Sequence, residues 1–296
     1  MPISHEFDYV KPATLAEALA ALEGAGGDAE LLAGGTDLVA WLRDGAARPE
    51  LVIDLKGIDG LSDISVDDGV LSMGALATFA DVIESEVAAE ALPVLGEMAG
   101  TMGSTGVRNR ATLAGNICSA VPSCDSGPVL LVCEAEVGVA GPRDGRVVPV
   151  TEWFRGPGKT ALGASEIVVG IRVPVPPSGH GACYVKLRRT RGEDLAQAGV
   201  AALALPGGVY RVAFGAVAPT PVRARRIEEL LAGKSLDDDV IARAKKLVAD
   251  ETSPIADIRA SREYRAHMLP VMLERCLRAA AARRDGSGPP YGTQLI

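Results

Sequence analysis

A double-glycine turn is the first feature of this sequence that could do chemistry. Gly34 and Gly35 stand between an apolar stretch at residues 31–33 and a helical pattern at 38–43, and Thr36 and Asp37 follow them. Glycines let a ligand approach the backbone closely, and N–H groups at such a turn can bind phosphate oxygens. A tight turn without a ligand fits the same residues equally well, because glycine turns are common.

A second polar segment of small residues lies about 80 residues further along the chain. Thr112, Gly115 and Asn116 combine a hydroxyl, a bare backbone position and an amide, and Asp125 follows nine residues after Asn116. A carboxylate there can accept hydrogen bonds from a ribose or ribityl diol. The alternative is a polar turn in which Asp125 caps a helix that contains Pro128. Without the first glycine turn, the capping interpretation would be favoured.

Other familiar sites lack key residues. Residues 156–160 (GPGKT) end as a phosphate-binding P-loop does, but Trp153 stands where that motif needs its first glycine. The dinucleotide fingerprint GxGxxG is absent, and the histidines are scattered. Cys118, Cys124 and Cys133 form no CxxC pair and lack a fourth ligand nearby, so we expect reduced, buried cysteines and no metal site. We assign no catalytic residue.

Composition narrows the class of protein. The 296 residues carry a formal net charge of −8, and an acidic chain argues against non-specific nucleic-acid binding. The first 14 residues do not have the basic and apolar segments of a signal peptide, and no apolar stretch reaches bilayer length. We therefore expect a cytoplasmic protein with no membrane span and no nucleic-acid partner.

The pattern of elements predicts a mixed α/β and α+β fold in several units. Three prolines at 174–177 and two glycines by 181 mark the clearest boundary. Beyond it, a three-stranded antiparallel sheet is expected, with helices near 222–231, 238–249 and 261–282. The glycine- and proline-rich end is expected to be a flexible tail. The predicted units are 1–56, 57–177, 178–284 and the tail 285–296.

Taken together, the two glycine segments resemble the FAD-binding subunits of molybdenum hydroxylases. That family includes the medium subunit of carbon monoxide dehydrogenases and the flavin domain of xanthine dehydrogenases. The resemblance is carried by residues 32–38 (LAGGTDL), 107–116 (VRNRATLAGN) and 122–125 (PSCD), and it runs from about residue 7 to residue 284. Ala114 departs from it, because many relatives have glycine there. Alanine is also small, so the expected flavin contact is kept.

The resemblance implies a fold and a set of binding residues. The fold is a two-part FAD-binding domain of the vanillyl-alcohol-oxidase type, followed by a C-terminal domain of the carbon monoxide dehydrogenase flavoprotein type. FAD would lie extended between the first two units, with its pyrophosphate at residues 31–37 and phosphate and diol groups at the second segment. Two later positions would contact the flavin. The implied FAD-binding residues are Leu31, Leu32, Ala33, Gly34, Gly35, Thr36, Asp37, Ala111, Thr112, Gly115, Asn116, Asp125, Val168 and Lys186.

The resemblance also implies that this chain is the electron outlet of a larger oxidoreductase. Its implied partners are a large subunit with molybdopterin and a small subunit with [2Fe–2S] clusters, in a dimer of heterotrimers. Two alternatives remain open: a stand-alone FAD-dependent oxidase of the same flavin fold, and a scaffold subunit without a cofactor. A relative of hydroxybenzoyl-CoA reductase, with a further iron–sulfur cluster, is disfavoured because the sequence has no cysteine-rich insert.

Overall fold

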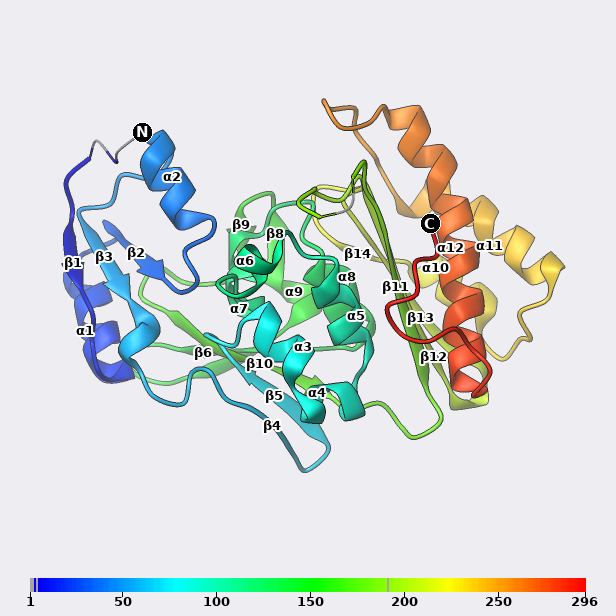
Figure 1. The fold of residues 1–296 in the computed structure, drawn as a ribbon, viewed down its shortest axis with the longest axis horizontal. Coiled ribbons are helices and arrows are strands. Elements are labelled where there is room, and N and C mark those ends of the chain that lie inside the picture. The colour runs from blue at the N-terminus through cyan, green and yellow to red at the C-terminus, as the bar shows by residue number, and fades with distance from the viewer. Residues whose placement is uncertain (1–2, 4, 191) are drawn as a thin grey trace.

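The computed structural model describes residue 3 and residues 5–190 and 192–296, which form three units in a row (Figure 1). The first unit is a parallel sheet in the order β1-β3-β2, with a helix after each of the first two strands. Its elements are β1 (Asp8–Val10), α1 (Leu15–Gly24), β2 (Ala29–Leu32), α2 (Leu38–Asp44) and β3 (Leu51–Asp54). Thr14 caps α1 by accepting a hydrogen bond from the N–H of Glu17. The double-glycine turn lies between β2 and α2, as predicted.

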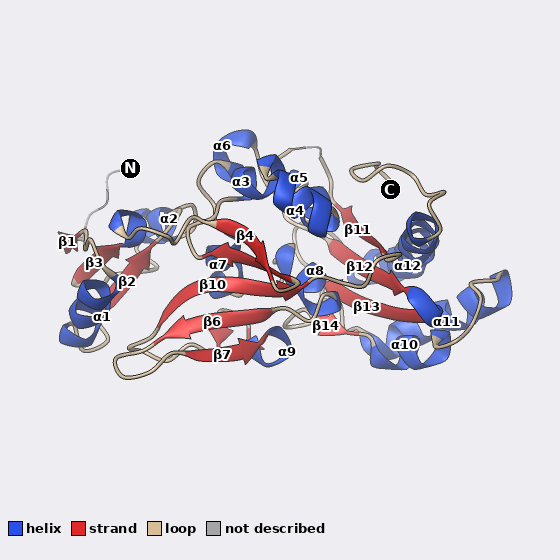
Figure 2. Cartoon of the chain, turned by 90° about the horizontal axis from the view of Figure 1, so that it is seen from below, coloured by secondary structure: helices blue, strands red, loops and turns tan. Residues whose placement is uncertain are grey.

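The central unit is a five-stranded antiparallel sheet in the order β4-β5-β10-β6-β7. The hairpins predicted at 64–74 and 137–148 are both confirmed. The strands are β4 (Ile64–Asp67), β5 (Val70–Gly74), β6 (Glu136–Ala140), β7 (Arg146–Pro149) and β10 (Ile167–Pro174). The helices are α3 (Phe79–Glu84), α4 (Glu86–Ala91), α5 (Val94–Gly100), α6 (Thr105–Arg108), α7 (Leu113–Ser119), α8 (Ser126–Val132) and α9 (Val150–Trp153). Of these, α5 and α8 pack against the C-terminal sheet (Figure 2).

The C-terminal sheet has four antiparallel strands, so the prediction of three was wrong. The strands are β11 (Gly181–Leu187), β12 (Ala198–Leu205), β13 (Val209–Gly215) and β14 (Val222–Arg223), in that order. Residues 222 and 223 were predicted to begin a helix, but they pair with β13. A strand of two residues is too short to show the alternation of apolar and polar residues that predicts a strand. The helix starts only at Arg225. The helices are α10 (Arg225–Leu231), α11 (Asp238–Glu251) and α12 (Arg262–Arg284).

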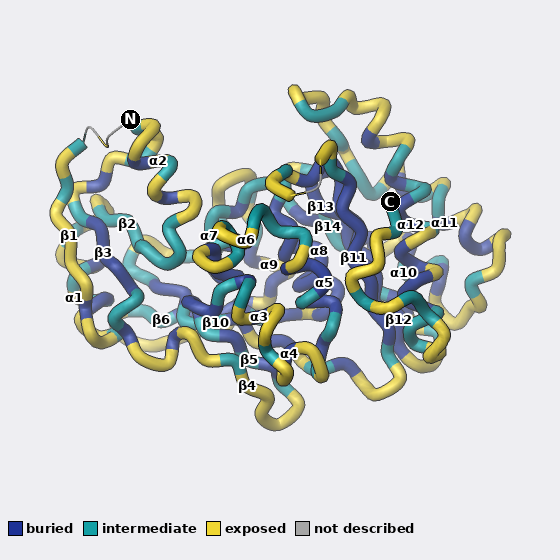
Figure 3. The backbone as a smooth tube through the Cα atoms, in the orientation of Figure 1, coloured by how far each residue is buried: buried dark blue, intermediate teal, exposed yellow. Residues whose placement is uncertain are grey.

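Both faces of the C-terminal sheet are covered, which explains why every residue of β11 and β12 is buried (Figure 3). Alternate residues of β11 join different cores: Ala182 and Tyr184 face the core of the central unit, whereas Cys183 and Val185 face α12. This strand therefore ties the central and C-terminal units together. Among the described residues, no helix combines the length and the hydropathy that a membrane-spanning helix needs.

The segment predicted to be a loose tail folds back onto the body of the protein. Tyr291 packs against the central core, and its hydroxyl accepts a hydrogen bond from the N–H of Ala182 at 3.3 Å. Leu295 and Ile296 pack against the C-terminal core. The flexibility of residues 285–296 stays a prediction, but their contacts place them beside β11.

Candidate functional site

A cavity of about 700 Å³ lies where the three units meet, with a volume typical of small-molecule sites. Its lining comes from the β2–α2 turn, from α7 and the segments around it, from the start of β10, and from β11. Thirteen of the predicted binding residues line it: Leu31, Ala33, Gly34, Gly35, Thr36, Asp37, Ala111, Thr112, Gly115, Asn116, Asp125, Val168 and Lys186. Leu32 does not line the cavity. It lies on β2 and packs with Leu38, Leu42 and Val52 in the first unit.

The double-glycine turn presents free backbone donors at this cavity. The N–H groups of Gly34, Gly35, Thr36 and Asp37 have no hydrogen-bond acceptor among the described residues. Gly35 has a φ of +79°, a conformation that favours glycine. Four consecutive unbonded N–H groups suit an anion with several oxygens, such as a pyrophosphate. The residues present therefore fit the group that the sequence predicts there.

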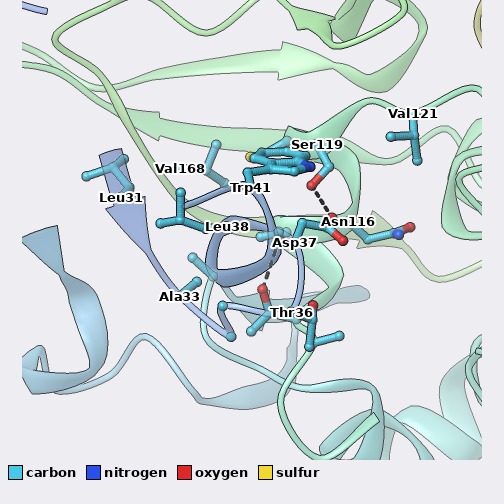
Figure 4. A pocket seen from close by; sticks show the side chains of 18 of the residues that line it. Leu31, Ala33, Thr36, Asp37, Leu38, Trp41, Asn116, Ser119, Val121 and Val168 are labelled. Carbon is cyan, nitrogen blue, oxygen red and sulfur yellow. Dashed lines mark hydrogen bonds between the residues drawn. The ribbon is translucent and has the colours of Figure 1, made fainter. Parts of the chain in front are cut away.

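The two glycine segments pack directly on each other. A Cβ atom placed on Gly34 would lie 1.9 Å from the carbonyl oxygen of Arg110, the residue that precedes the second segment. The Ser119 hydroxyl, at the end of α7, donates a 2.5 Å hydrogen bond to Asp37 (Figure 4). Side chains about 80 residues apart in the chain thus close one wall of the cavity. Glycine at position 34 is required by this contact, independently of any ligand.

The polar side chains of the second segment, residues 111–116, make hydrogen bonds within the protein. The Thr112 hydroxyl caps α7 by accepting a 2.9 Å hydrogen bond from the N–H of Gly115. The Asn116 amide oxygen accepts hydrogen bonds from the Ser126 hydroxyl at 2.6 Å and the Cys124 thiol at 3.0 Å. These bonds fix the shape of the wall and leave the amide nitrogen of Asn116 without a partner among the described residues.

Asp125 was expected to be either a ligand for a diol or a helix cap, and the capping interpretation is wrong. It precedes α8 but makes no capping hydrogen bond. Its carboxylate instead accepts hydrogen bonds from the Lys186 ammonium at 2.7 Å and from the Tyr184 hydroxyl at 2.6 Å. Burial raises the pKa of Asp125, although Lys186 and Tyr184 favour its charged form. A carboxylate has about four acceptor positions, so a ligand hydroxyl can still bind.

Several residues at the site were missed in the sequence. Tyr184 stands two residues before Lys186, and strand alternation places both side chains on one face, which was a usable signal. Trp41 lines the cavity one helical turn after Leu38. Arg189 and Arg259 line it from loops of the C-terminal unit. Their positions depend on how that unit packs, and no local pattern indicates it.

The stretch that ends like a P-loop is an ordinary hairpin. Residues 156–160 span the end of β8 (Phe154–Gly156), a two-residue turn and β9 (Lys159–Thr160), with no helix after the lysine. The prediction that it is not a P-loop is confirmed. Among the described residues, no cluster of three or more histidine, cysteine or acidic side chains could hold a metal ion.

Lys56 supports the glycine turn from behind. Its ammonium donates a 3.1 Å hydrogen bond to the carbonyl of Ala33 and lies 2.6 Å from a carboxylate oxygen of Asp54. Asp54 is buried, and it also accepts a 2.5 Å hydrogen bond from the Tyr9 hydroxyl. The carbonyl just before Gly34 is thereby held by a side chain from the short 3-10 turn (Leu55–Gly57) that follows β3.

We predict that Lys56→Met weakens ligand binding at the glycine turn by about two- to tenfold, the loss of one ordinary hydrogen bond. Titration of the purified variant with FAD, the ligand that the sequence predicts at this turn, measures this loss of affinity. Lys159→Met is the control, because Lys159 is exposed in the β8–β9 hairpin. Equal affinities for the two variants would show that Lys56 does not support the turn.

Comparison with known proteins identifies relatives along almost the whole chain. Residues 5–176 match the family described as FAD binding domain in molybdopterin dehydrogenase, and residues 182–280 match the CO dehydrogenase flavoprotein C-terminal domain. The chain is 34% identical to the carbon monoxide dehydrogenase medium chain of Afipia carboxidovorans, over 95% of this chain and 99% of the relative. It is 32% identical to the xanthine dehydrogenase FAD-binding subunit of Escherichia coli O157:H7, over 94% and 97% of the two chains.

Solved structures share the fold as well. A carbon monoxide dehydrogenase from Hydrogenophaga pseudoflava superimposes with a TM-score of 0.92 at 35% identity, covering 96% of this chain and 99% of that one. Quinoline 2-oxidoreductase from Pseudomonas putida 86 gives a TM-score of 0.90 at 28% identity, covering 96% and 99%.

Proposed function

We propose that the cavity of this chain, which belongs to the family of FAD-binding subunits of molybdenum hydroxylases, holds FAD. The chain with its FAD is then the electron outlet of a larger complex. One observation carries the proposal: a single cavity of about 700 Å³ is lined by both glycine segments, with the N–H groups of residues 34–37 unbonded. When bound, FAD supplies the redox chemistry, and the protein supplies binding, orientation and electrostatics.

Different groups of lining residues bind different parts of FAD. Leu31 and the turn at residues 33–37 hold the pyrophosphate, chiefly through backbone N–H groups. Residues 111–116 hold phosphate and diol groups, with Thr112 and Gly115 shaping the wall. Asp125 accepts a diol hydrogen bond at its remaining acceptor positions, and Val168 and Lys186 contact the flavin. Leu32 supports the turn through the core of the first unit, so we assign it no direct contact.

The proposed partners are a large molybdopterin subunit and a small subunit with [2Fe–2S] clusters, in a dimer of heterotrimers. Support comes from relatives described as a medium chain and an FAD-binding subunit, and from the similar solved structure of a Cu,Mo-CO dehydrogenase. We propose unit boundaries at 56/57 and 177/178. The second falls between the two family matches, which end at 176 and begin at 182. The proposed location is the cytoplasm.

The experiment is to isolate the chain with its partners and measure its flavin. We predict one FAD per chain, released into the supernatant by acid precipitation. Among the described residues that line the cavity, Cys118 is the only histidine or cysteine, and burial raises the pKa of its thiol to about 12. Flavin retained in the pellet would contradict non-covalent binding. A complex without flavin would leave a scaffold role.

The electron-outlet role is tested separately. Substrate oxidation by the complex should reduce the flavin, and the isolated chain with FAD should not oxidise the same organic substrate. Full substrate oxidation by the isolated chain would instead establish a stand-alone oxidase.

A further inference from the structure

A buried ion pair lies outside the cavity, between the central unit and the end of the C-terminal unit. Glu97 on α5 and Arg283 on α12 are joined at 2.7 Å, and both side chains are only 4% exposed. Charges this deeply buried lose their hydration, so an ion pair there is weak evidence for stability compared with apolar packing. Its position therefore calls for another explanation.

Each oxygen of the Glu97 carboxylate accepts two hydrogen bonds. One oxygen accepts hydrogen bonds from Arg283 at 3.1 Å and from the backbone N–H of Tyr184 at 2.8 Å. The other accepts from Arg283 at 2.7 Å and from the N–H of Gly292 at 2.8 Å. The pair thus connects α5, β11, α12 and the C-terminal tail at one point.

Arg283 fixes the same strand and holds the tail. It donates to the carbonyl of Ala182 at 2.7 Å, and its guanidinium lies 4.0 Å from the centre of the Tyr291 ring. It also donates to the carbonyls of Pro289 and Pro290, each at 3.0 Å. β11 is therefore held at two positions, 182 and 184, and the second is two residues before Lys186, which lines the cavity.

Two alternate side chains of β11 connect the Glu97–Arg283 pair to the cavity. Tyr184 and Lys186 point to the same face of the strand, and both bind the Asp125 carboxylate. Lys186 also donates to the carbonyl of Thr101 at 3.1 Å. Thr101 caps the end of α5, the helix that carries Glu97. The same helix thus holds β11 at both Tyr184 and Lys186.

We propose that Glu97 and Arg283 are positioning residues for the flavin site, which set β11 against α5 so that Lys186 and Asp125 form their pair at the cavity. Neither residue lines the cavity, so they act only through β11. This inference rests on the proposed FAD function. The consequence is that the Glu97–Arg283 pair, which lies beside the C-terminal tail, controls the affinity for FAD and the midpoint potential of the flavin.

The chain offers a closely matched control. Glu228 on α10 also accepts a 2.8 Å hydrogen bond from a strand N–H, that of Val212, and is paired with Arg223, the two side chains being 11% and 7% exposed. Val212 lies on β13 and does not line the cavity. Glu97→Gln and Glu228→Gln therefore each remove one charge of low exposure that holds a strand and an arginine, but only Glu97 is connected to Lys186.

The test measures the FAD dissociation constant and the flavin midpoint potential in both variants within the assembled complex. We expect Glu97→Gln to weaken FAD binding about tenfold, the effect of losing one hydrogen bond to a charged group. It should also lower the midpoint potential, because a displaced Lys186 stabilises the more negatively charged reduced cofactor less. Glu228→Gln should change neither quantity.

A second experiment distinguishes a positioning role of Glu97 from a general disturbance of the fold. In the double variant Asp125→Asn/Lys186→Met, the pair that Glu97 is proposed to position is gone. Adding Glu97→Gln there should leave the FAD dissociation constant unchanged. An equal effect in both backgrounds, or equal effects of Glu97→Gln and Glu228→Gln, would overturn the inference. Absence of FAD binding by the unaltered protein would instead refute the proposed function itself.

Discussion

Gly34→Ala is expected to abolish FAD binding, or to weaken it by at least about 100-fold, equivalent to about 2.7 kcal/mol. The added Cβ would lie 1.9 Å from the carbonyl oxygen of Arg110, 2.7 Å from its carbonyl carbon and 3.0 Å from the Cα of Ala111. All three are backbone atoms, so no side chain can move aside. The two glycine segments must separate, which displaces the N–H groups of residues 34–37 from the pyrophosphate. Titration of the purified variant with FAD measures the loss.

Gly24→Ala is the matched control for this prediction. Gly24 belongs to the same unit, at the end of α1, and a Cβ there has no atom within 4 Å and no positive φ. Its FAD affinity should equal that of the unaltered protein. If Gly34→Ala folds and binds FAD as tightly as Gly24→Ala does, the contact between the two segments does not shape the binding site.

Lys186→Met is expected to have the largest effect on stability. It leaves the Asp125 carboxylate buried without its counter-charge, and breaking a buried pair from one side costs about 3–5 kcal/mol. Denaturant unfolding of the protein without FAD measures this cost. The control is Lys245→Met, whose pair with Glu274 is about one-third exposed and is expected to contribute at most about 1 kcal/mol.

The cost should depend on pH in a defined direction. Burial raises the pKa of Asp125, and removing Lys186 removes the charge that opposed this rise. A folded-state pKa above the unfolded value means that the folded protein binds the proton more tightly, so stability falls as pH rises from about 4 through the raised pKa. The loss of free energy of unfolding caused by Lys186→Met should thus be smaller at about pH 5 than at about pH 8.

Neutralising both partners should recover part of the loss. In Asp125→Asn/Lys186→Met neither position leaves an unpaired buried charge, so the free energy of unfolding of this variant should exceed the value that adding the two single effects predicts. Strict additivity, or a pH-independent loss in Lys186→Met, would show that the two side chains do not act as a buried pair.

The local elements of this protein could be predicted because each depends on a short pattern. The turn at Gly34 and Gly35 follows from glycine between an apolar strand and a helical pattern, and the hairpins at 64–74 and 137–148 follow from alternation around a turn. β14 was missed because two paired residues show no periodicity, and the helix expected from residue 222 begins at Arg225.

The contacts that build the site depend on segments far apart in the chain. Asp125 and Lys186 are 61 residues apart, and Glu97 and Arg283 are 186 apart. The residue type of Asp125 allowed a cap or a ligand, and only the packing of β11 showed that its charge is paired with lysine. The close approach of Gly34 to Arg110 likewise has no local signature.

The sequence by itself therefore determined the two glycine segments, most strands and helices, and through its resemblance to known proteins the family and its cofactor. These follow from backbone preferences and from the spacing of apolar residues, which act over a few positions. The tertiary structure alone decided which polar groups are desolvated together, because burial and ion pairing exist only once distant segments meet. That is why the unbonded N–H groups of residues 34–37 and the Glu97–Arg283 pair behind β11 appeared only in the folded chain.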